Sequence, residues 1–114
     1  MKLNSYNNLL ELFFDQYKKQ DKNNIFLTNL GNPQHKLNWE KTYLLVNHLS
    51  NQISKDIKLG DRCILISENR PEWLISDLAI MLAGGISVPS YTYGGSFCYH
   101  AEKNQVFIGY VIGL

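Results

Sequence analysis

The pattern of apolar and polar residues is clearest between Gly60 and Tyr91. The unbroken apolar run from Cys63 to Ile66 predicts a strand covered on both faces, as in a parallel sheet. The residues after it predict a helix that begins near Pro71, where a missing amide hydrogen is tolerated. Asn69 is the expected helix cap, and Glu72 suits the positive end of the helix dipole. Helical spacing of the following apolar residues predicts one buried face, formed by Leu74, Ile75, Leu78, Ala79 and Leu82.

A second strand is predicted directly after this helix. Gly84 and Gly85 should stop the helix, because glycine readily takes the left-handed conformation of a helix C-terminus. Ile86 to Val88 then begins a strand, with Pro89 near its end. Two strands joined by one packed helix should be parallel, with a right-handed crossover. The pattern therefore predicts a βαβ unit.

An amphipathic helix is predicted near the N-terminus, capped by Asn4 or Ser5. Lys18 and Lys19 favour its C-terminal end. Its aromatic stripe could form a partner-binding face, but packing against the core is the favoured interpretation. The stripe consists of Leu9, Leu10, Phe13, Phe14 and Tyr17.

A hairpin and a second helix are predicted between these two units. Ile25 to Leu27 and Lys36 to Trp39 are the expected strands, joined by a turn at Gly31 to Gln34. Glu40 to Ile57 is the expected helix. Its apolar face is predicted to contain Val46, Leu49 and Ile53, extended by Leu45 and Ile57.

The last part of the chain has a weaker pattern. Tyr93 to Ser96 is the expected loop, and Phe97 to Gln105 a short helix. A third strand is predicted from Val106 to Ile112, interrupted by Gly109.

Composition narrows the class of protein. A chain of 114 residues is one domain at most, spanning 1–114. Its 45% hydrophobic and 18% charged residues argue against disorder. A net charge of +1 gives no strong electrostatic field that would attract nucleic acid. No apolar run reaches the ~18–20 residues of a transmembrane helix, and no signal peptide is recognisable. Cys63 and Cys98 lack metal-ligand spacing and are expected to be reduced, as in a cytoplasmic protein.

Several uncommon residues lie at fixed offsets: Gly60-Asp61-Arg62, Ser67 to Trp73 (SENRPEW), Asp77-Leu78-Ala79, Gly84-Gly85, Val88-Pro89 and Tyr91-Thr92. This arrangement resembles the N-terminal region of the AMP-forming acyl-CoA synthetases, in the adenylate-forming superfamily. SENRPEW and VPSYT are most similar to the long-chain fatty acid–CoA ligase branch, and Asn38-Trp39-Glu40 resembles a strand-to-helix junction of the family. The resemblance covers about residues 3–92, and residues 93–114 form a divergent tail.

The resemblance implies an α/β fold: part of the N-terminal subdomain of adenylate-forming enzymes, with a βαβ parallel-sheet unit and preceding helices. It implies that a full-length enzyme would use ATP, Mg²⁺ and CoA to convert a fatty acid to acyl-AMP and then to acyl-CoA. A cytoplasmic location is implied, with peripheral membrane attachment of the full-length enzyme left open. Acyl chain length and oligomeric state are not determined.

The residues that would carry this chemistry are not found in the sequence. Binding of ATP phosphates needs a glycine-rich loop with hydroxyls and a cation nearby, and the family's version ends in Pro-Lys-Gly. Gly84-Gly85 and Gly94-Gly95 lack a following Lys and Ser/Thr, so they are interpreted as a helix stop and a loop. The family's acidic ribose motif and C-terminal catalytic lysine are also missing. We therefore assign no catalytic, cofactor-binding or metal residues, and expect this chain alone to be inactive.

Three polar residues nevertheless follow the C-terminal end of the predicted parallel strand, where open α/β sheets bind ligands. For Glu68 and Arg70, ion pairs with neighbouring segments are favoured over a catalytic role, and for Asn69 a helix cap. Trp73 is interpreted as a packing residue rather than a substrate wall. The histidines, interpreted as surface or hydrogen-bonded residues because they are unclustered, are His35, His48 and His100.

Two functions of different classes are compatible with these residues. The first is part of a fatty acid–CoA ligase, cut short after its first βαβ unit, whose exposed sheet edges would make it poorly soluble or loosely packed. The second is a small non-catalytic α/β module that binds a partner through the same faces. The apolar end from Tyr110 to Leu114 favours the first. A dinucleotide-binding domain is disfavoured, because no glycine fingerprint follows a strand.

Overall fold

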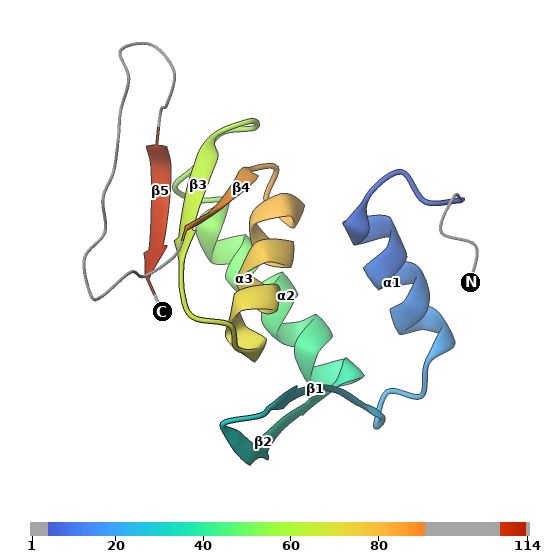
Figure 1. The fold of residues 1–114 in the computed structure, drawn as a ribbon. Coiled ribbons are helices and arrows are strands. Elements are labelled where there is room, and N and C mark those ends of the chain that lie inside the picture. The colour runs from blue at the N-terminus through green and yellow to red at the C-terminus, as the bar shows by residue number, and fades with distance from the viewer. Residues whose placement is uncertain (1–4, 91–107, 114) are drawn as a thin grey trace.

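The structure, a computed structural model, describes residues 5–90 and 108–113 (Figure 1). It has the expected α/β class, with a two-stranded antiparallel hairpin and a three-stranded parallel sheet. None of the helices within the described ranges is long and apolar enough to cross a membrane. The elements are α1 (Leu9–Lys19), β1 (Ile25–Asn29), β2 (Asn32–Asn38), α2 (Trp39–Ile53), β3 (Arg62–Ile66), α3 (Pro71–Leu82), β4 (Ile86–Ser90) and β5 (Ile108–Gly113).

The central strand of the parallel sheet is β3, which pairs with β4 on one side and β5 on the other. Cys63, Ile64 and Leu65 are all buried although their side chains alternate between the two faces, so the predicted buried strand is confirmed. On the β5 side the register shifts between Ile108 and Tyr110, which places an irregularity at the predicted interruption by Gly109. The predicted helix at 97–105 and the start of this strand lie outside the described residues.

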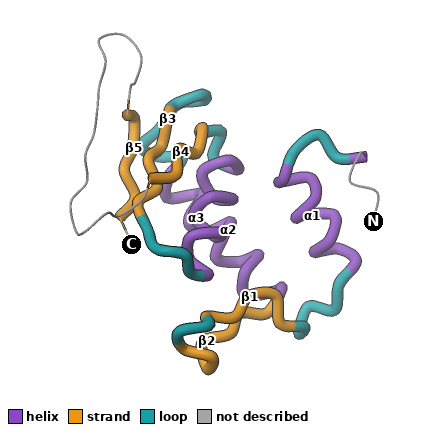
Figure 2. The backbone as a smooth tube through the Cα atoms, viewed as in Figure 1, coloured by secondary structure: helices purple, strands orange, loops and turns teal. Residues whose placement is uncertain are grey.

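Helices α2 and α3 lie against one face of the parallel sheet, and α1 lies on their far side (Figures 1 and 2). The sheet-side core joins one residue of α2, two of β3 and two of α3: Ile53, Cys63, Leu65, Ala79 and Ile80. Complete burial of a side chain the size of Leu or Ile contributes about 1.5–3 kcal/mol. The β3–α3–β4 unit is therefore held together by packing as well as by strand pairing.

A second core lies between the two central helices, the hairpin and α1. Phe13 of α1 is 4% exposed and packs near Phe26 and Trp39, whose rings stack with centroids 4.0 Å apart. The aromatic residues of the α1 stripe thus form a packing face, as predicted, whereas Leu9 at its start is 45% exposed. The buried members of this core are Phe13, Leu37, Val46, Ile75 and Leu78.

The start of α1 differs from the prediction. Its cap is Asn8, whose side-chain oxygen accepts a hydrogen bond from the amide of Glu11 at 2.9 Å. The Glu11 carboxylate in turn accepts one from the amide of Asn7 at 2.9 Å. Ser5 lies a full turn too early, and Asn4 lies outside the described residues. The bond from the Glu11 amide to Asn8 and the bond from the Asn7 amide to Glu11 favour this start, because each satisfies an amide at the helix end.

The predicted second helix is too long at its C-terminal end. It stops at Ile53 rather than Ile57, and the amide of Asp56 bonds back to the carbonyl of Ile53 at 2.9 Å. Ile57 leaves the helix but still packs on the sheet-side core. The prediction that Leu45 lies on the buried face is wrong. Its side chain is 37% exposed, because it lies about 100° around the helix from Val46.

The hairpin turn is also shorter than predicted. It consists of Leu30 and Gly31, so β2 already begins at Asn32. The side-chain oxygen of Asn29 accepts hydrogen bonds from the amides of Gly31 at 2.9 Å and Asn32 at 3.3 Å, which closes the turn locally. Trp39 begins α2 instead of ending the strand.

The α3–β4 turn follows the predicted glycine stop. The helix ends at Leu82, and Gly84 has a φ of +88°, a left-handed conformation that costs other residues energy. Its carbonyl accepts a hydrogen bond from the amide of Gly60 at 2.8 Å, and the amide of Ile86 donates to the carbonyl of Asp61 at 2.8 Å. These two bonds align the entrances of β3 and β4.

The end of α1 is fixed by a cluster around Tyr17. The Tyr17 hydroxyl donates to Glu40 Oε2 at 2.6 Å, and its ring stacks on Tyr43 with centroids 4.0 Å apart. The ammonium group of Lys22 lies 3.7 Å from the centre of the Tyr17 ring. The hydrogen bond to the Glu40 carboxylate, followed by burial, raises the pKa of Tyr17 to about 12.

Substituting Gly84 should test the left-handed turn. Gly84→Ala is expected to reduce the free energy of unfolding by about 1–2 kcal/mol, because a Cβ is strained at this φ. Contact with Leu59 Cδ1, 2.9 Å away, should add little, because that exposed side chain can rotate. Gly31→Ala, at a glycine without positive φ, is the control and should change stability by less than about 0.5 kcal/mol. Equal effects in urea unfolding would contradict this explanation.

Alkaline pH should weaken the Tyr17 cluster. Because the pKa is raised on folding from its ordinary value near 10, the stabilisation is complete below pH 10 and is lost as pH rises towards about 12. Near-ultraviolet titration should show one late-ionising tyrosine, absent in Tyr17→Phe and present in Tyr43→Phe, which keeps the bond to Glu40. A late-ionising tyrosine that survives Tyr17→Phe would refute the assignment.

Candidate functional site

A hollow lies at the C-terminal end of β3, where the loop 67–70 leads into α3. Open α/β sheets bind ligands beyond this end of their strands, so it is the first candidate site. The hollow measures ≈ 380 Å³ and is bounded on one side by the end of β1 and the hairpin turn, residues 27–31. The other side is formed by Asn69, Arg70, Pro71, Trp73 and Leu74.

Three charged or titratable side chains connect the hairpin to the start of α3. Nε2 of His35, on β2, lies 3.0 Å from Oε1 of Glu72, and Nε of Arg70 lies 3.8 Å from Oε2 of the same carboxylate. Their side chains are 38–42% exposed, so water screens these pairs and each contributes little stability. Glu68 is exposed and has no ion-pair partner among residues 5–90. The cluster links two elements and contains no activated nucleophile.

Asn69 does not cap α3, contrary to the prediction. The cap position is Arg70, with extended backbone angles and no side-chain hydrogen bond to the helix. Pro71 has no amide hydrogen, and the amide of Trp73 donates to the carbonyl of Arg70 at 2.9 Å. The start of the helix is therefore favoured by the fixed φ of Pro71 and by the negative charge of Glu72 in the first turn. Asn69 instead lines the hollow.

The other predicted residues mainly have structural roles. Trp73 packs against the sheet-side core, as predicted, and also borders the hollow. Cys63 is a buried free thiol, and burial raises its pKa, with the charge of Asp61 adding to the shift. It therefore behaves as a small apolar side chain. His48 is exposed on α2, whereas Cys98 and His100 lie outside the described residues.

The described residues do not fit ATP phosphates or a metal ion. No group of three His, Cys, Asp or Glu side chains that could hold a metal occurs within 5–90 and 108–113. Gly84 and Gly85 precede β4 and so lie at the sheet end opposite to the hollow. A Cβ on Gly85 would already lie 3.1 Å from the side chains of Cys63, Ile57 and Ile80, so Gly85 packs on the core and leaves no phosphate cradle.

Comparison with known proteins places these elements in a family context. A family model described as AMP-binding enzyme matches residues 13–97. A curated relative, the long-chain-fatty-acid–CoA ligase FadD15 of Mycobacterium tuberculosis, is 44% identical over 39 residues. That match covers 34% of this chain and 6% of the relative. The same values hold for FadD15 of Mycobacterium bovis, so the chain spans only a small part of both relatives.

Solved structures show the same fold. The anthranilate CoA ligase AuaEII, in complex with anthranoyl-AMP, has a TM-score of 0.65 at 19% identity, over 79% of this chain and 17% of that protein. The N-terminal subdomain of Klebsiella oxytoca NpsA has a TM-score of 0.62 at 22% identity, over 72% of this chain and 20% of that chain. The arrangement of elements described above is therefore shared with N-terminal subdomains of adenylate-forming enzymes.

Alanine substitutions of two asparagines should distinguish a residue that caps a helix from one that only lines the hollow. Asn38 caps α2 through a 2.7 Å hydrogen bond from the amide of Lys41 to its side-chain oxygen, so Asn38→Ala should cost about 1 kcal/mol of unfolding free energy. Asn69→Ala removes no cap and should change it by less than about 0.5 kcal/mol. A larger loss from Asn69→Ala in urea unfolding would overturn the assignment of Arg70 as the cap residue.

Proposed function

The chain belongs to the AMP-binding enzyme family, and we propose that it is part of a ligase that joins a fatty acid to CoA. In this proposal the full enzyme uses ATP and Mg²⁺ to form an acyl-adenylate with release of pyrophosphate, and the CoA thiol then displaces AMP. The observation that carries the fatty acid assignment is the 44% identity to FadD15.

The proposed contribution of this chain is structural. The β3–α3–β4 unit buries the sheet-side core and holds the loop 67–70 at the C-terminal edge of the sheet. Glu68, Asn69 and Arg70 are exposed on this loop, and Arg70 is engaged with Glu72. A general acid or base must lie within hydrogen-bond reach of the group that it protonates or deprotonates. None of these three side chains is hydrogen-bonded to a nucleophilic side chain among the described residues. We therefore assign the loop a positioning role.

The first test is the purified chain itself. Mixed with ATP, Mg²⁺, CoA and a long-chain fatty acid, it should give no fatty-acid-dependent pyrophosphate release above a protein-free control. Release that depends on the fatty acid would contradict a purely structural contribution.

The second test is a chimera in which residues 13–97, which match the AMP-binding family model, replace the segment of FadD15 that corresponds to the same part of that model. Acyl-CoA formation should be retained, because the segment supplies the same scaffold. Glu68→Gln in the chimera should leave the rate close to that of the parent, whereas loss of a catalytic acid or base would lower it by about 100-fold or more. Cys63→Asp, which places an unpaired charge in the core, should abolish activity together with folding.

Two results would count against the proposal. A chimera that folds, as judged by circular dichroism, but forms no acyl-CoA would contradict the ligase assignment. A 100-fold loss in a folded Glu68→Gln chimera would instead retain the ligase and move Glu68 into its catalytic machinery.

A further inference from the structure

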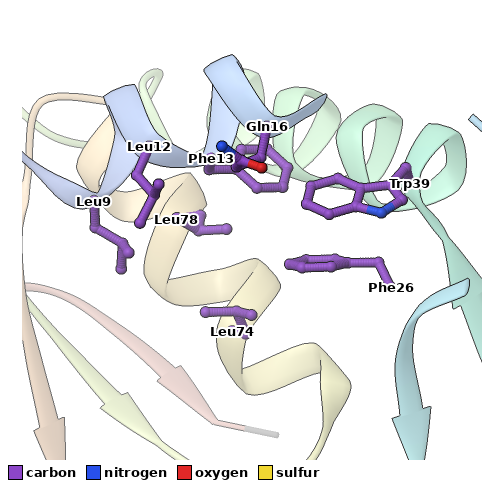
Figure 3. A pocket seen from close by; sticks show the side chains of 8 residues that line it. All are labelled: Leu9, Leu12, Phe13, Gln16, Phe26, Trp39, Leu74 and Leu78. Atoms are coloured by element: carbon purple, nitrogen blue, oxygen red, sulfur yellow. The ribbon is translucent and has the colours of Figure 1, made fainter. Parts of the chain in front are cut away.

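A second pocket lies between α1 and α3, and it shares only Leu74 with the hollow at the C-terminal end of β3 (Figure 3). It measures ≈ 240 Å³, and seven of its eight lining residues are apolar. Leu9 and Leu12 of α1 lie at one end and Phe26 and Trp39 at the other, with Leu78 of α3 between them. The proposed ligase function uses none of these side chains.

One end of this pocket is aromatic. The rings of Phe26 and Trp39 stack with centroids 4.0 Å apart and an interplanar angle of 29°. The ring of Phe13 lies 6.0 Å from that of Trp39 and 5.9 Å from that of Phe26. Aromatic rings prefer offset-stacked or edge-to-face contacts with centroids about 4.5–7 Å apart, so a further ring can pack on this group in the same way. The pocket therefore offers more to a flat ring than an aliphatic cavity would.

Polarity and size restrict the occupant further. Gln16 is the single polar residue in the lining, whereas an ordered water needs two to four polar partners. No charged residue lines the pocket, so a charged guest would lose hydration without gaining a partner. An apolar cavity of about 150 Å³ accommodates benzene, and ≈ 240 Å³ is larger by about one further fused ring.

We propose that this pocket binds a flat, uncharged, two-ring aromatic molecule that carries at most one hydrogen-bonding group. Leu9, which is 45% exposed, lies at the rim and leaves an entrance. The Gln16 amide can donate to or accept from the single polar group of the ligand. An uncharged aromatic ligand differs from the fatty acid of the proposed ligase, so this site is independent of the proposed ligase function.

The two tryptophans make the test specific. Trp39 lines this pocket and Trp73 borders the other hollow, so the indole N–H signals of the ¹⁵N-labelled full chain report on separate places. Titration with 2-naphthol should shift the Trp39 signal saturably and leave the Trp73 signal in place. 2-Naphthoate has the same rings and a negative charge, and should bind at least about tenfold more weakly.

Matched variants complete the experiment. Leu12→Phe fills the pocket and should weaken 2-naphthol binding by about tenfold or more, whereas Leu44→Phe, on an exposed position of α2, should not. Leu9→Phe at the rim replaces Leu12→Phe if that variant does not fold. The proposal is overturned by an unsaturable shift, by equal shifts of both tryptophans, by equal binding of 2-naphthoate, or by binding that survives filling of the pocket.

Discussion

The double pairing of β3 is the constraint on which the rest of the described structure depends. Its backbone groups are hydrogen-bonded to a parallel strand on each side, and its residues from Cys63 to Leu65 are buried. A strand in this position needs apolar side chains on both faces. Because the neighbouring strand is parallel, a helix must return the chain to the end of the sheet at which β3 begins. The packing of α3, the glycine turn at Gly84 and the position of the loop 67–70 all follow from that requirement.

Much of this unit could be predicted from the sequence, because its determinants are local. The apolar run of β3, Pro71 at the start of α3 and Gly84 after its end each restrict the backbone directly. Caps were less predictable, since the chain contains many asparagines and only hydrogen-bond geometry distinguishes Asn8 from its neighbours. The contact between His35 and Glu72 joins residues 37 positions apart, and no periodicity in the sequence indicates it.

The two hollows differ in how far their residues could be foreseen. Asn69 and Arg70 follow a recognisable strand, so sheet topology alone places them at the C-terminal ends of the strands, where ligands commonly bind. The apolar pocket combines residues from four elements, and each apolar one looks like an ordinary core residue in its own helix or strand. Its volume depends on how closely α1 approaches α3, which is a tertiary property. Sequence patterns predict which side chains are buried, but not where their packing is incomplete.

The register of the parallel sheet has a consequence for the order in which it assembles. Ile64 pairs with Val88 through β4 and with Val111 through β5, so the second pairing closes a loop about twice as long. Each doubling of loop length adds about 0.6 kcal/mol of closure entropy, and the β4 pairing is additionally supported by the α3 packing. The β3–β4 half should therefore form first and retain its amide protons longest in hydrogen exchange, with β5 joining a preformed edge.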